Sequence, residues 1–134
     1  MNRDSAIRTA RTAVTNAQNA GRMDSYVAAE KMGIEMEREW VSALGARTRP
    51  EHAEADGQVV GVDEPFIVGG EKLMFPGDRS GSGWNIYNCR CTMIAKVNGV
   101  DTSDAKRRDG YGVMPDMTFA QWQNSKRGEG YLQE

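Results

Sequence analysis

The first forty residues change from a helical to a strand-like pattern of apolar positions. Residues 2–20 contain no proline or glycine, and four apolar side chains recur at helical spacing: Ile7, Ala10, Val14 and Ala17. This narrow stripe predicts a helix packed closely against the rest of the protein. Gly21 is expected to end it, and Asp24 to cap a second, shorter helix. From residue 34 to 41 apolar and mainly acidic residues alternate, which predicts a strand with Arg38 as the exception on its apolar face.

Turn residues divide the middle of the chain into short segments. Pro50 suits the first turn of a short helix, which Gly57 is expected to end. Extended segments are predicted after it at residues 58–62, 65–68, 72–75 and 84–97. The last of these is expected to turn near Tyr87 and Asn88. We therefore expect several short strands, joined by loops, that follow the N-terminal helices.

Residues 101–117 are polar and show no apolar periodicity, so they predict a surface extension. Thr118 is a candidate N-cap for a short tail helix, held by Phe119 and Trp122. The predicted fold class is α+β, with two N-terminal helices packed on a small, mostly antiparallel sheet and a short C-terminal helix. The pattern divides the chain into a domain at residues 1–100 and a polar extension at 101–134.

Composition narrows the classes of function. The chain has 134 residues, of which 39% are hydrophobic and 27% charged, and its formal net charge is −2. A globular protein of this charge lacks the overall footprint of nucleic-acid binding. Basic residues are in local excess in the first helix and at residues 106–108, so a small DNA-contacting arm built from the Arg11 side of that helix and the second run is an alternative. No apolar run has the length of a membrane span, and the first residues do not resemble a signal peptide.

The histidine and the cysteines of the chain, which are the residues that most often bind zinc, lie in one segment. His52 is the single histidine, and Cys89 and Cys91 are the two cysteines. Cysteines two apart on a strand point to one face and do not readily form a disulfide with each other. If the helix that carries His52 and Asp56 packs on that face, the four side chains suit tetrahedral zinc in a structural role. The alternative is two buried thiols beside a hydrogen-bonded histidine.

The same segment carries a family resemblance. Its motifs, in order, are Ala10-Arg11-Thr12, Asn19-Ala20-Gly21, Arg47-Thr48-Arg49, His52, Asp56-Gly57, Phe66, Phe75-Pro76-Gly77-Asp78 and Asn88-Cys89-Arg90-Cys91. Together they resemble the phage Mu F-like head morphogenesis domain over about residues 7–97, which is more specific than any single motif. Two departures stand out. Ala13 replaces the acidic residue usual in the family, and the long helical region that usually precedes the domain is not present here.

The resemblance implies a minor head protein of a tailed phage or prophage. Such a protein would associate with portal and head proteins, lie in the virion, and occupy the host cytoplasm during assembly. It implies zinc as a candidate cofactor through the His and Cys positions, and it allows contact with packaged DNA. The motif residues expected to be structural are Arg47, Arg49, Gly57, Asn88 and Arg90. The two arginines of the first motif lie next to acidic strand residues such as Glu37 and Glu39 and are predicted to bridge carboxylates and backbone carbonyls, with a surface anion site as the rival.

An enzyme is the competing class. His52 with Glu51, Glu54 or Asp56 could serve as a general base, and Cys89 as a nucleophile. This alternative describes a small metal-dependent hydrolase, nuclease or toxin-like domain. No catalytic triad or phosphate-binding loop is evident in the sequence, so an interaction module is the favoured reading.

Overall fold

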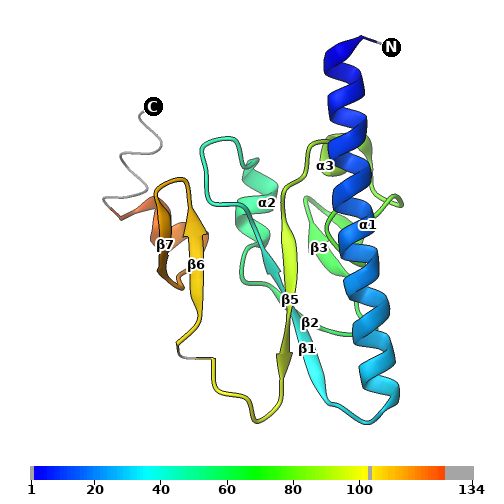
Figure 1. Ribbon diagram of the computed structural model, residues 1–134, viewed down its shortest axis with the longest axis vertical. Coiled ribbons are helices and arrows are strands. Elements are labelled where there is room, and N and C mark those ends of the chain that lie inside the picture. The colour runs from blue at the N-terminus through cyan, green and yellow to red at the C-terminus, as the bar shows by residue number, and fades with distance from the viewer. Residues whose placement is uncertain (1, 103, 126–134) are drawn as a thin grey trace.

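The computed structural model describes residues 2–102 and 104–125, and it begins with one long helix along the side of the molecule (Figure 1). This helix, α1, spans Arg3–Lys31, and the Asn2 side chain caps its start by accepting a hydrogen bond from the Ser5 backbone N–H at 2.8 Å. The predicted break at Gly21 is wrong. A glycine inside a helix costs only about 1 kcal/mol, and helix-forming residues continue on both sides. Asp24 therefore lies within α1 and caps nothing.

Polar side chains attach α1 to the body of the protein. The Thr15 hydroxyl donates to the Cys89 carbonyl at 2.7 Å, and the Asn16 amide donates to the Gly77 carbonyl at 2.9 Å. Asn19, which is 1% exposed, donates to the carbonyls of Pro76 and Cys91. These bonds satisfy loop carbonyls that have no strand partner.

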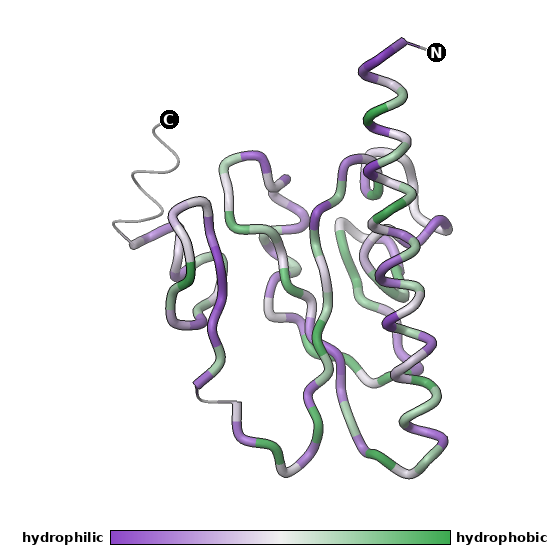
Figure 2. The backbone as a smooth tube through the Cα atoms, viewed as in Figure 1, coloured by the Kyte–Doolittle hydropathy of each residue, from purple (hydrophilic) through white to green (hydrophobic). Residues whose placement is uncertain are grey.

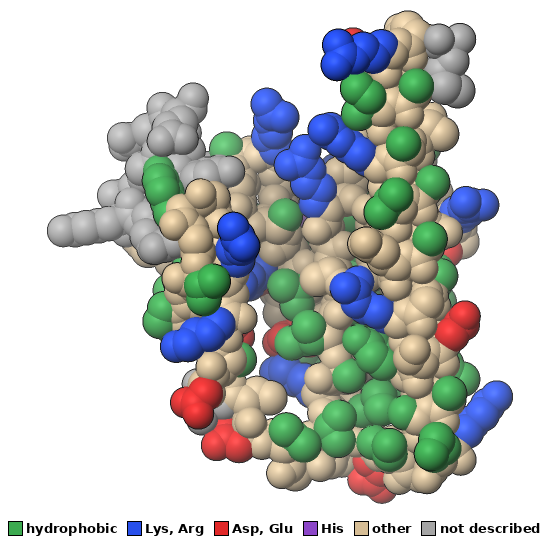
Figure 3. All heavy atoms as spheres, in the orientation of Figure 1, with side chains coloured by type: hydrophobic (Ala, Val, Ile, Leu, Met, Phe, Trp, Pro, Cys, Tyr) green, Lys and Arg blue, Asp and Glu red, His purple; other side chains and the backbone are tan. Residues whose placement is uncertain are grey.

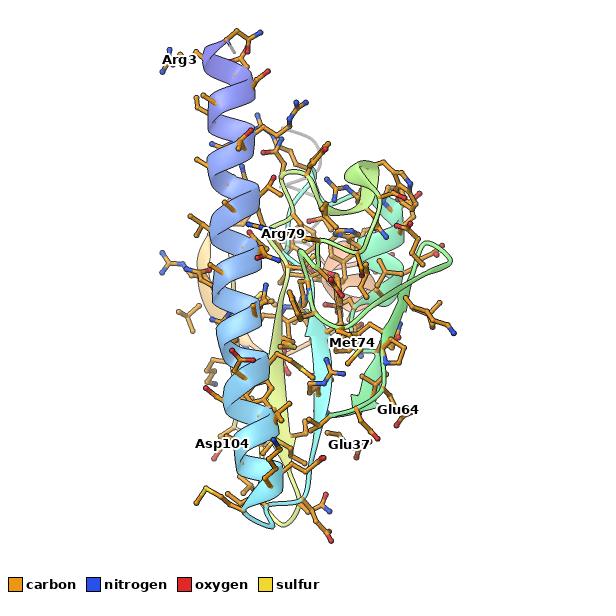
Figure 4. All side chains as sticks on the ribbon, turned by 90° about the vertical axis from the view of Figure 1, so that its right-hand side faces the viewer. Arg3, Glu37, Glu64, Met74, Arg79 and Asp104 are labelled. Carbon is orange, nitrogen blue, oxygen red and sulfur yellow. The ribbon has the colours of Figure 1, made fainter. Side chains whose placement is uncertain are left out.

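The predicted apolar stripe is not the buried face of α1. Ile7 and Val14 are 37% and 54% exposed, and Figure 2 shows polar and apolar residues mixed along the helix. The middle of α1 is attached through amides and hydroxyls, and its apolar contacts with the core come later, from Met23 and Tyr26. Apolar periodicity over residues 7–17 therefore identified the wrong face. Figure 4 shows the helix standing beside the strands rather than across them.

A three-stranded antiparallel sheet forms the centre, with the order β2-β1-β5. Its strands are β1 (Met36–Val41), β2 (Val59–Gly61) and β5 (Thr92–Val97). Alternation places Trp40 and its cross-strand partner Met93 in the core, where both are at most 1% exposed. The strand predicted at residues 34–41 is confirmed.

The remaining elements lie on either side of this sheet. Helix α2 is Pro50–Ala55, strands β3 (Phe66–Val68) and β4 (Glu71–Leu73) form a hairpin, and helix α3 is Gly83–Ile86. The short helix and the two strands agree with the predicted positions. The strand predicted at 84–97 is wrong in its first half, because a helical turn occupies its start and β5 begins only at Thr92. The fold class, α+β, is confirmed.

Residues beyond 100 form structure that apolar periodicity did not indicate. Strands β6 (Lys106–Asp109) and β7 (Gly112–Pro115) make a hairpin within the segment predicted as a polar surface extension, for which no strands were expected. The predicted tail helix is confirmed as α4 (Phe119–Gln123), and Thr118 caps it in a capping box with Gln121. Trp122, which is fully buried, packs here with Leu44, Met114 and Phe119 in a second core. The boundary between a domain at 1–100 and an extension at 101–134 stays a prediction.

None of the helices in the described part of the chain combines the length and apolar character that crossing a bilayer requires.

Candidate metal centre

Helix α2 holds His52 inside the protein. Pro50 occupies the first turn, where its missing N–H is not needed. The His52 backbone carbonyl accepts a hydrogen bond from the Ser42 hydroxyl, and the Trp40 ring meets the imidazole edge-on, with centroids 5.6 Å apart. Only 2% of His52 is exposed. Strand β1 and its continuation thus fix the imidazole from one side.

The backbone between α3 and β5 places the two cysteines against this imidazole. Asn88 adopts the left-handed conformation, with φ of 56°, and the Asn19 amide of α1 donates to the Cys91 carbonyl at 3.3 Å. Cys89 and Cys91 are 2% and 4% exposed and carry free thiols. They precede β5, so the turn, not a strand pleat, directs both sulfurs toward His52.

The side-chain atoms of His52, Cys89 and Cys91 form one compact group. The imidazole Nδ1 lies 3.7 Å from the Cys89 Sγ and 3.3 Å from the Cys91 Sγ, and the three candidate ligand atoms lie within 4.8 Å of one another. Zinc bonds of about 2.3 Å to sulfur and about 2.0 Å to nitrogen, at a tetrahedral angle, separate S and N by about 3.5 Å. The observed spacing therefore fits a tetrahedral ion.

Asn85 of α3 fixes the orientation of the imidazole. Its amide nitrogen donates to the Val68 carbonyl and to the Glu71 carboxylate, each at 3.0 Å, so its Oδ1 is left to accept from His52 Nε2 at 2.9 Å. Hydrogen bonds from Ser82 and Asn85 hold the pKa of Glu71 below its usual value. Arg49 Nη1 stands farther from Nε2, at 3.4 Å. The ring proton thus sits on Nε2, and the Nδ1 lone pair faces the sulfurs, as in metal-ligating histidines.

The two thiols influence each other. The hydrogen bond between them lowers the pKa of Cys89, while the same bond and burial raise the pKa of Cys91 well above its usual value.

Comparison with known proteins decides the family. The family model described as Phage Mu protein F like protein matches residues 1–94, a span that contains His52 and both cysteines. The chain belongs to the Phage Mu protein F like family.

Among the proteins that are similar to this member of the Phage Mu protein F like family is a minor head protein. Minor head protein GP7 of Bacillus phage SPP1 is 34% identical over 124 residues, which cover 89% of this chain and 39% of that protein. NAD(+)--arginine ADP-ribosyltransferase EFV of Enterococcus faecalis (strain ATCC 700802 / V583) is 30% identical over 117 residues, or 87% of this chain and 24% of that protein. Uncharacterized protein YqbB of Bacillus subtilis (strain 168) is 34% identical over 72% of this chain and 32% of its own length.

The chain spans about a quarter to two fifths of these relatives. No solved structure matches it.

One predicted ligand, Asp56, lies apart from the cluster of His52, Cys89 and Cys91. Helix α2 ends at Ala55, and Asp56 follows it with ψ of 130°, so its side chain leaves the face that carries His52. The carboxylate accepts from the backbone N–H groups of Ser42 and Phe119 at 2.8 and 2.7 Å, and it pairs with Arg107 at 2.6 Å. The structure therefore does not bring Asp56 to the cluster, because its lone pairs are engaged elsewhere, and water is left as the expected alternative for the fourth ligand.

The remaining motif residues shape the loops around the cluster. Gly57 has φ of 82°, and its N–H donates to the Trp40 carbonyl at 2.9 Å, so the turn after α2 needs a residue without a Cβ. Arg49 donates to the Tyr87 carbonyl rather than to an acidic strand residue, and Glu39 pairs instead with Lys96 at 3.2 Å. Arg49 therefore bonds a backbone carbonyl, as one part of the prediction expects, whereas the expected pairing with Glu39 is not observed among the described residues.

Two functional residues escaped the sequence reasoning. Asn85 orients the imidazole, and Arg107 neutralises Asp56 from β6, outside the residues that the family model matches. Asn85 gave no signal, because a single asparagine in a Gly/Ser-rich stretch is usual in loops. Arg107 belongs to the basic run at 106–108, for which the sequence indicates only a contact with DNA.

Proposed function

We propose that this chain is a minor head protein of a tailed phage or prophage, active as an interaction module in head morphogenesis and associated with the portal. The observation that carries this proposal is membership of the Phage Mu protein F like family together with 34% identity to a minor head protein over 89% of the chain. Because the chain spans 39% of that relative, its portal contact, its place in the virion and its presence in the host cytoplasm during assembly are all part of the proposal.

Mass spectrometry of purified heads tests this role. In the phage or induced prophage that encodes the chain, tagged protein should copurify with the portal and should be found in heads at substoichiometric amounts relative to the major capsid protein. A capsid protein and a cytoplasmic host protein serve as positive and negative controls. Heads that form normally without the chain and never contain it would contradict the proposal.

A hydrolase or nuclease based on His52 is not favoured. Within the described residues, the hydrogen-bond partners of the His52 ring are Arg49, Asn85 and the two thiols, and none is a carboxylate. Asp56, the strongest candidate for an acid–base partner, is committed to Arg107. A general base must reach the proton that it removes from the substrate, and here both ring nitrogens of the buried His52 already face Asn85 and the two thiols. The ADP-ribosyltransferase name belongs to a relative of which the chain spans only 24%.

We further propose that His52, Cys89 and Cys91 bind one zinc ion. Support comes from the N···S spacing, the proton-bearing Nε2 held by Asn85, and the burial of all three side chains. When bound, the ion would fasten α2 to the segment before β5. Within the described residues these three groups alone make up the cluster, which leaves the fourth tetrahedral position to water.

Metal analysis of the purified, reduced chain tests this site. We expect about one zinc per chain, and we expect saturating zinc at 100 times its Kd to stabilise the fold by about 2.7 kcal/mol. Cys91→Ser should abolish stoichiometric zinc and remove the effect of a strong chelator on Tm, whereas Ser80→Ala, an exposed change outside the cluster, should alter neither. A chain free of metal, with a Tm indifferent to chelator and to added zinc, would leave buried thiols beside a hydrogen-bonded histidine as the correct account.

A further inference from the structure

Two adjoining hollows form one groove between α1 and the segment of residues 88–91. The larger has a volume of about 740 Å³ and reaches from α1 to the loop at residues 43–49. The smaller, of about 550 Å³, is bounded by Ala10 and Val14 of α1. The two hollows are continuous, because the same residues line both of them: Arg11, Cys89 and Arg90. Each hollow alone has the size of a small-ligand pocket, so the whole groove has room for several residues of a chain.

The larger hollow concentrates positive charge in a chain whose net charge is −2. Its lining contains no Asp or Glu but four arginines: Arg11, Arg47, Arg49 and Arg90. Figure 3 shows Lys and Arg side chains gathered in this part of the surface. Among the described residues, the salt bridges involve Arg107 and Lys96, not these four. A solvated basic face normally intersperses acidic residues, which relieve repulsion between like charges. Here the guanidinium charges converge without relief, so they attract an anionic group.

The smaller hollow adds an apolar wall to the groove. Val14 is 54% exposed, and Ala10 is exposed beside it. Both belong to the apolar stripe of α1, whose helical spacing is typical of a face that packs against another surface. The described part of the chain leaves all four residues of that stripe exposed. An apolar wall next to the arginines favours a ligand that joins anionic groups to apolar side chains, because a ligand that offers phosphates alone would leave the wall in water.

The two sides of the groove are fixed relative to each other. The Asn88 N–H donates to the Thr12 hydroxyl of α1 at 3.2 Å, and the Thr15 hydroxyl donates to the Cys89 carbonyl at 2.7 Å. These bonds hold the segment of Arg90 against α1. The basic side and the apolar side therefore keep their spacing, which lowers the entropy lost when one ligand contacts both.

We propose that this groove binds an acidic segment of a partner protein, with carboxylates on the arginines and an apolar side chain against Ala10 and Val14. Guanidinium forks match carboxylate oxygens in a bidentate geometry. The arginines set the sign of the ligand's charge, the exposed wall requires an apolar group, and two hollows in a row favour a chain over a small anion. The proposal gives a surface and a partner chemistry to the interaction module proposed above, and it rests on that role for the source of the segment.

Fluorescence anisotropy tests the proposal with the full 134-residue chain. The probe is a labelled synthetic peptide of about 12 residues, built from repeats of Glu-Glu-Leu. We expect a Kd on the order of 10–100 μM at about 50 mM salt, since a short peptide loses much of its contact energy to ordering. Replacing every Leu of the peptide by Ser, or every Glu by Gln, should weaken binding about tenfold or more. These two peptides need no change to the protein, so they test the groove whatever the variants do to folding.

Two variants of the protein separate the two sides of the groove. Arg47→Gln with Arg90→Gln removes two exposed charges and should weaken binding of the parent peptide about tenfold. Val14→Ser shortens the apolar wall and should weaken it about fivefold. Circular dichroism on each variant should show the helix content of the parent, because all three side chains are exposed.

The matched controls make the same kinds of change on the β6–β7 hairpin, outside the groove. Lys106→Gln with Arg108→Gln, and separately Val113→Ser, should leave affinity within about twofold of the parent. Equal losses in these controls would assign binding to overall charge and hydrophobicity, and would overturn the proposal. Parent affinity in Val14→Ser would overturn it too, as would inorganic polyphosphate that displaces the probe as well as unlabelled peptide does, because the groove would then respond to charge alone. The assay uses purified chain and synthetic peptide, so its failure leaves the head proposal intact, and a failure to find the protein in heads would not alter its result.

Discussion

Replacing Asp56 by Ala is expected to destabilise the protein by about 3–5 kcal/mol, the usual result of leaving one member of a buried ion pair alone. The side chains of Asp56 and Arg107 are 2% and 10% exposed, and two bonds join them, at 2.6 and 3.1 Å. The same carboxylate also accepts from the N–H groups of Ser42 and Phe119. Its removal would leave two amides without their acceptor, and a buried guanidinium without its counter-charge and bonded only to the carbonyls of Ser42 and Met117.

Urea unfolding followed by circular dichroism measures this effect. Arg107→Met, measured alone and with Asp56→Ala, completes a double-mutant cycle, and we expect a coupling energy of about 2 kcal/mol or more because the two groups touch. The matched control is Glu39→Ala, which breaks the Glu39–Lys96 pair on the sheet surface. That exposed pair should contribute only about 0.2–1 kcal/mol. Equal, small losses from Asp56→Ala and Glu39→Ala would show that the hairpin and α4 do not depend on the buried pair.

The pair also explains how the C-terminal elements join the rest of the chain. Asp56 closes α2, Arg107 lies on β6, and Phe119 begins α4, so one carboxylate connects three elements. Trp122 adds a hydrogen bond from its indole N–H to Asp109 at 2.8 Å. Polar contacts of this kind have no periodicity. They are the physical reason that the sequence of residues 101–117 predicts only a polar surface extension and not the hairpin that forms there.

Local rules predicted the elements that depend on local chemistry. Alternation over residues 34–41 identified β1, the Pro50 and Gly57 pair bounded α2, and Thr118 marked the start of α4. The same rules failed where contacts between residues distant in the sequence determine the structure. Gly21 continues a helix because nothing nearby requires a turn, and α1 binds through Thr15, Asn16 and Asn19, whose burial only the loops at 76–77 and 89–91 create.

The candidate metal centre was predictable in its members but not in its geometry. A single histidine and two cysteines inside one family motif indicated that they meet, and the structure brings them together. Asp56 was misplaced because helical spacing from His52 assumes that α2 continues one residue further than it does. The tautomer of the imidazole depends on Asn85, which in turn depends on a carbonyl in β3, and no spacing in the sequence encodes that relation.

Arg38 is the second residue whose replacement is expected to destabilise the protein strongly, because its side chain is buried. Arg38 is fully buried on the apolar face of β1, and its guanidinium donates to three backbone carbonyls: those of Gly61, Glu64 and Met74. Figure 4 labels Glu64 and Met74, which lie on the chain segments that this side chain joins. Its charge lies 4.8 Å from the centre of the Phe66 ring, and desolvation lowers the pKa of Arg38. Arg38 thus supplies these backbone carbonyls with the hydrogen bonds that a neighbouring strand supplies within a sheet.

Arg38→Met should lower the free energy of unfolding by about 3–5 kcal/mol, because each carbonyl bonded to a charged donor contributes roughly 1.5–3 kcal/mol and these bonds act together. Lysine cannot supply the planar fork, so Arg38→Lys should recover less than half of the loss. Urea unfolding monitored by tryptophan fluorescence gives the measurement, since Trp40 is two residues away and fully buried. Arg79→Met, the same change at an exposed site, should stay within about 0.5 kcal/mol of the parent. If Arg38→Met unfolds at the parent's urea midpoint, the loops at 61–64 and 74 are held by packing alone, and the guanidinium contributes no net stability.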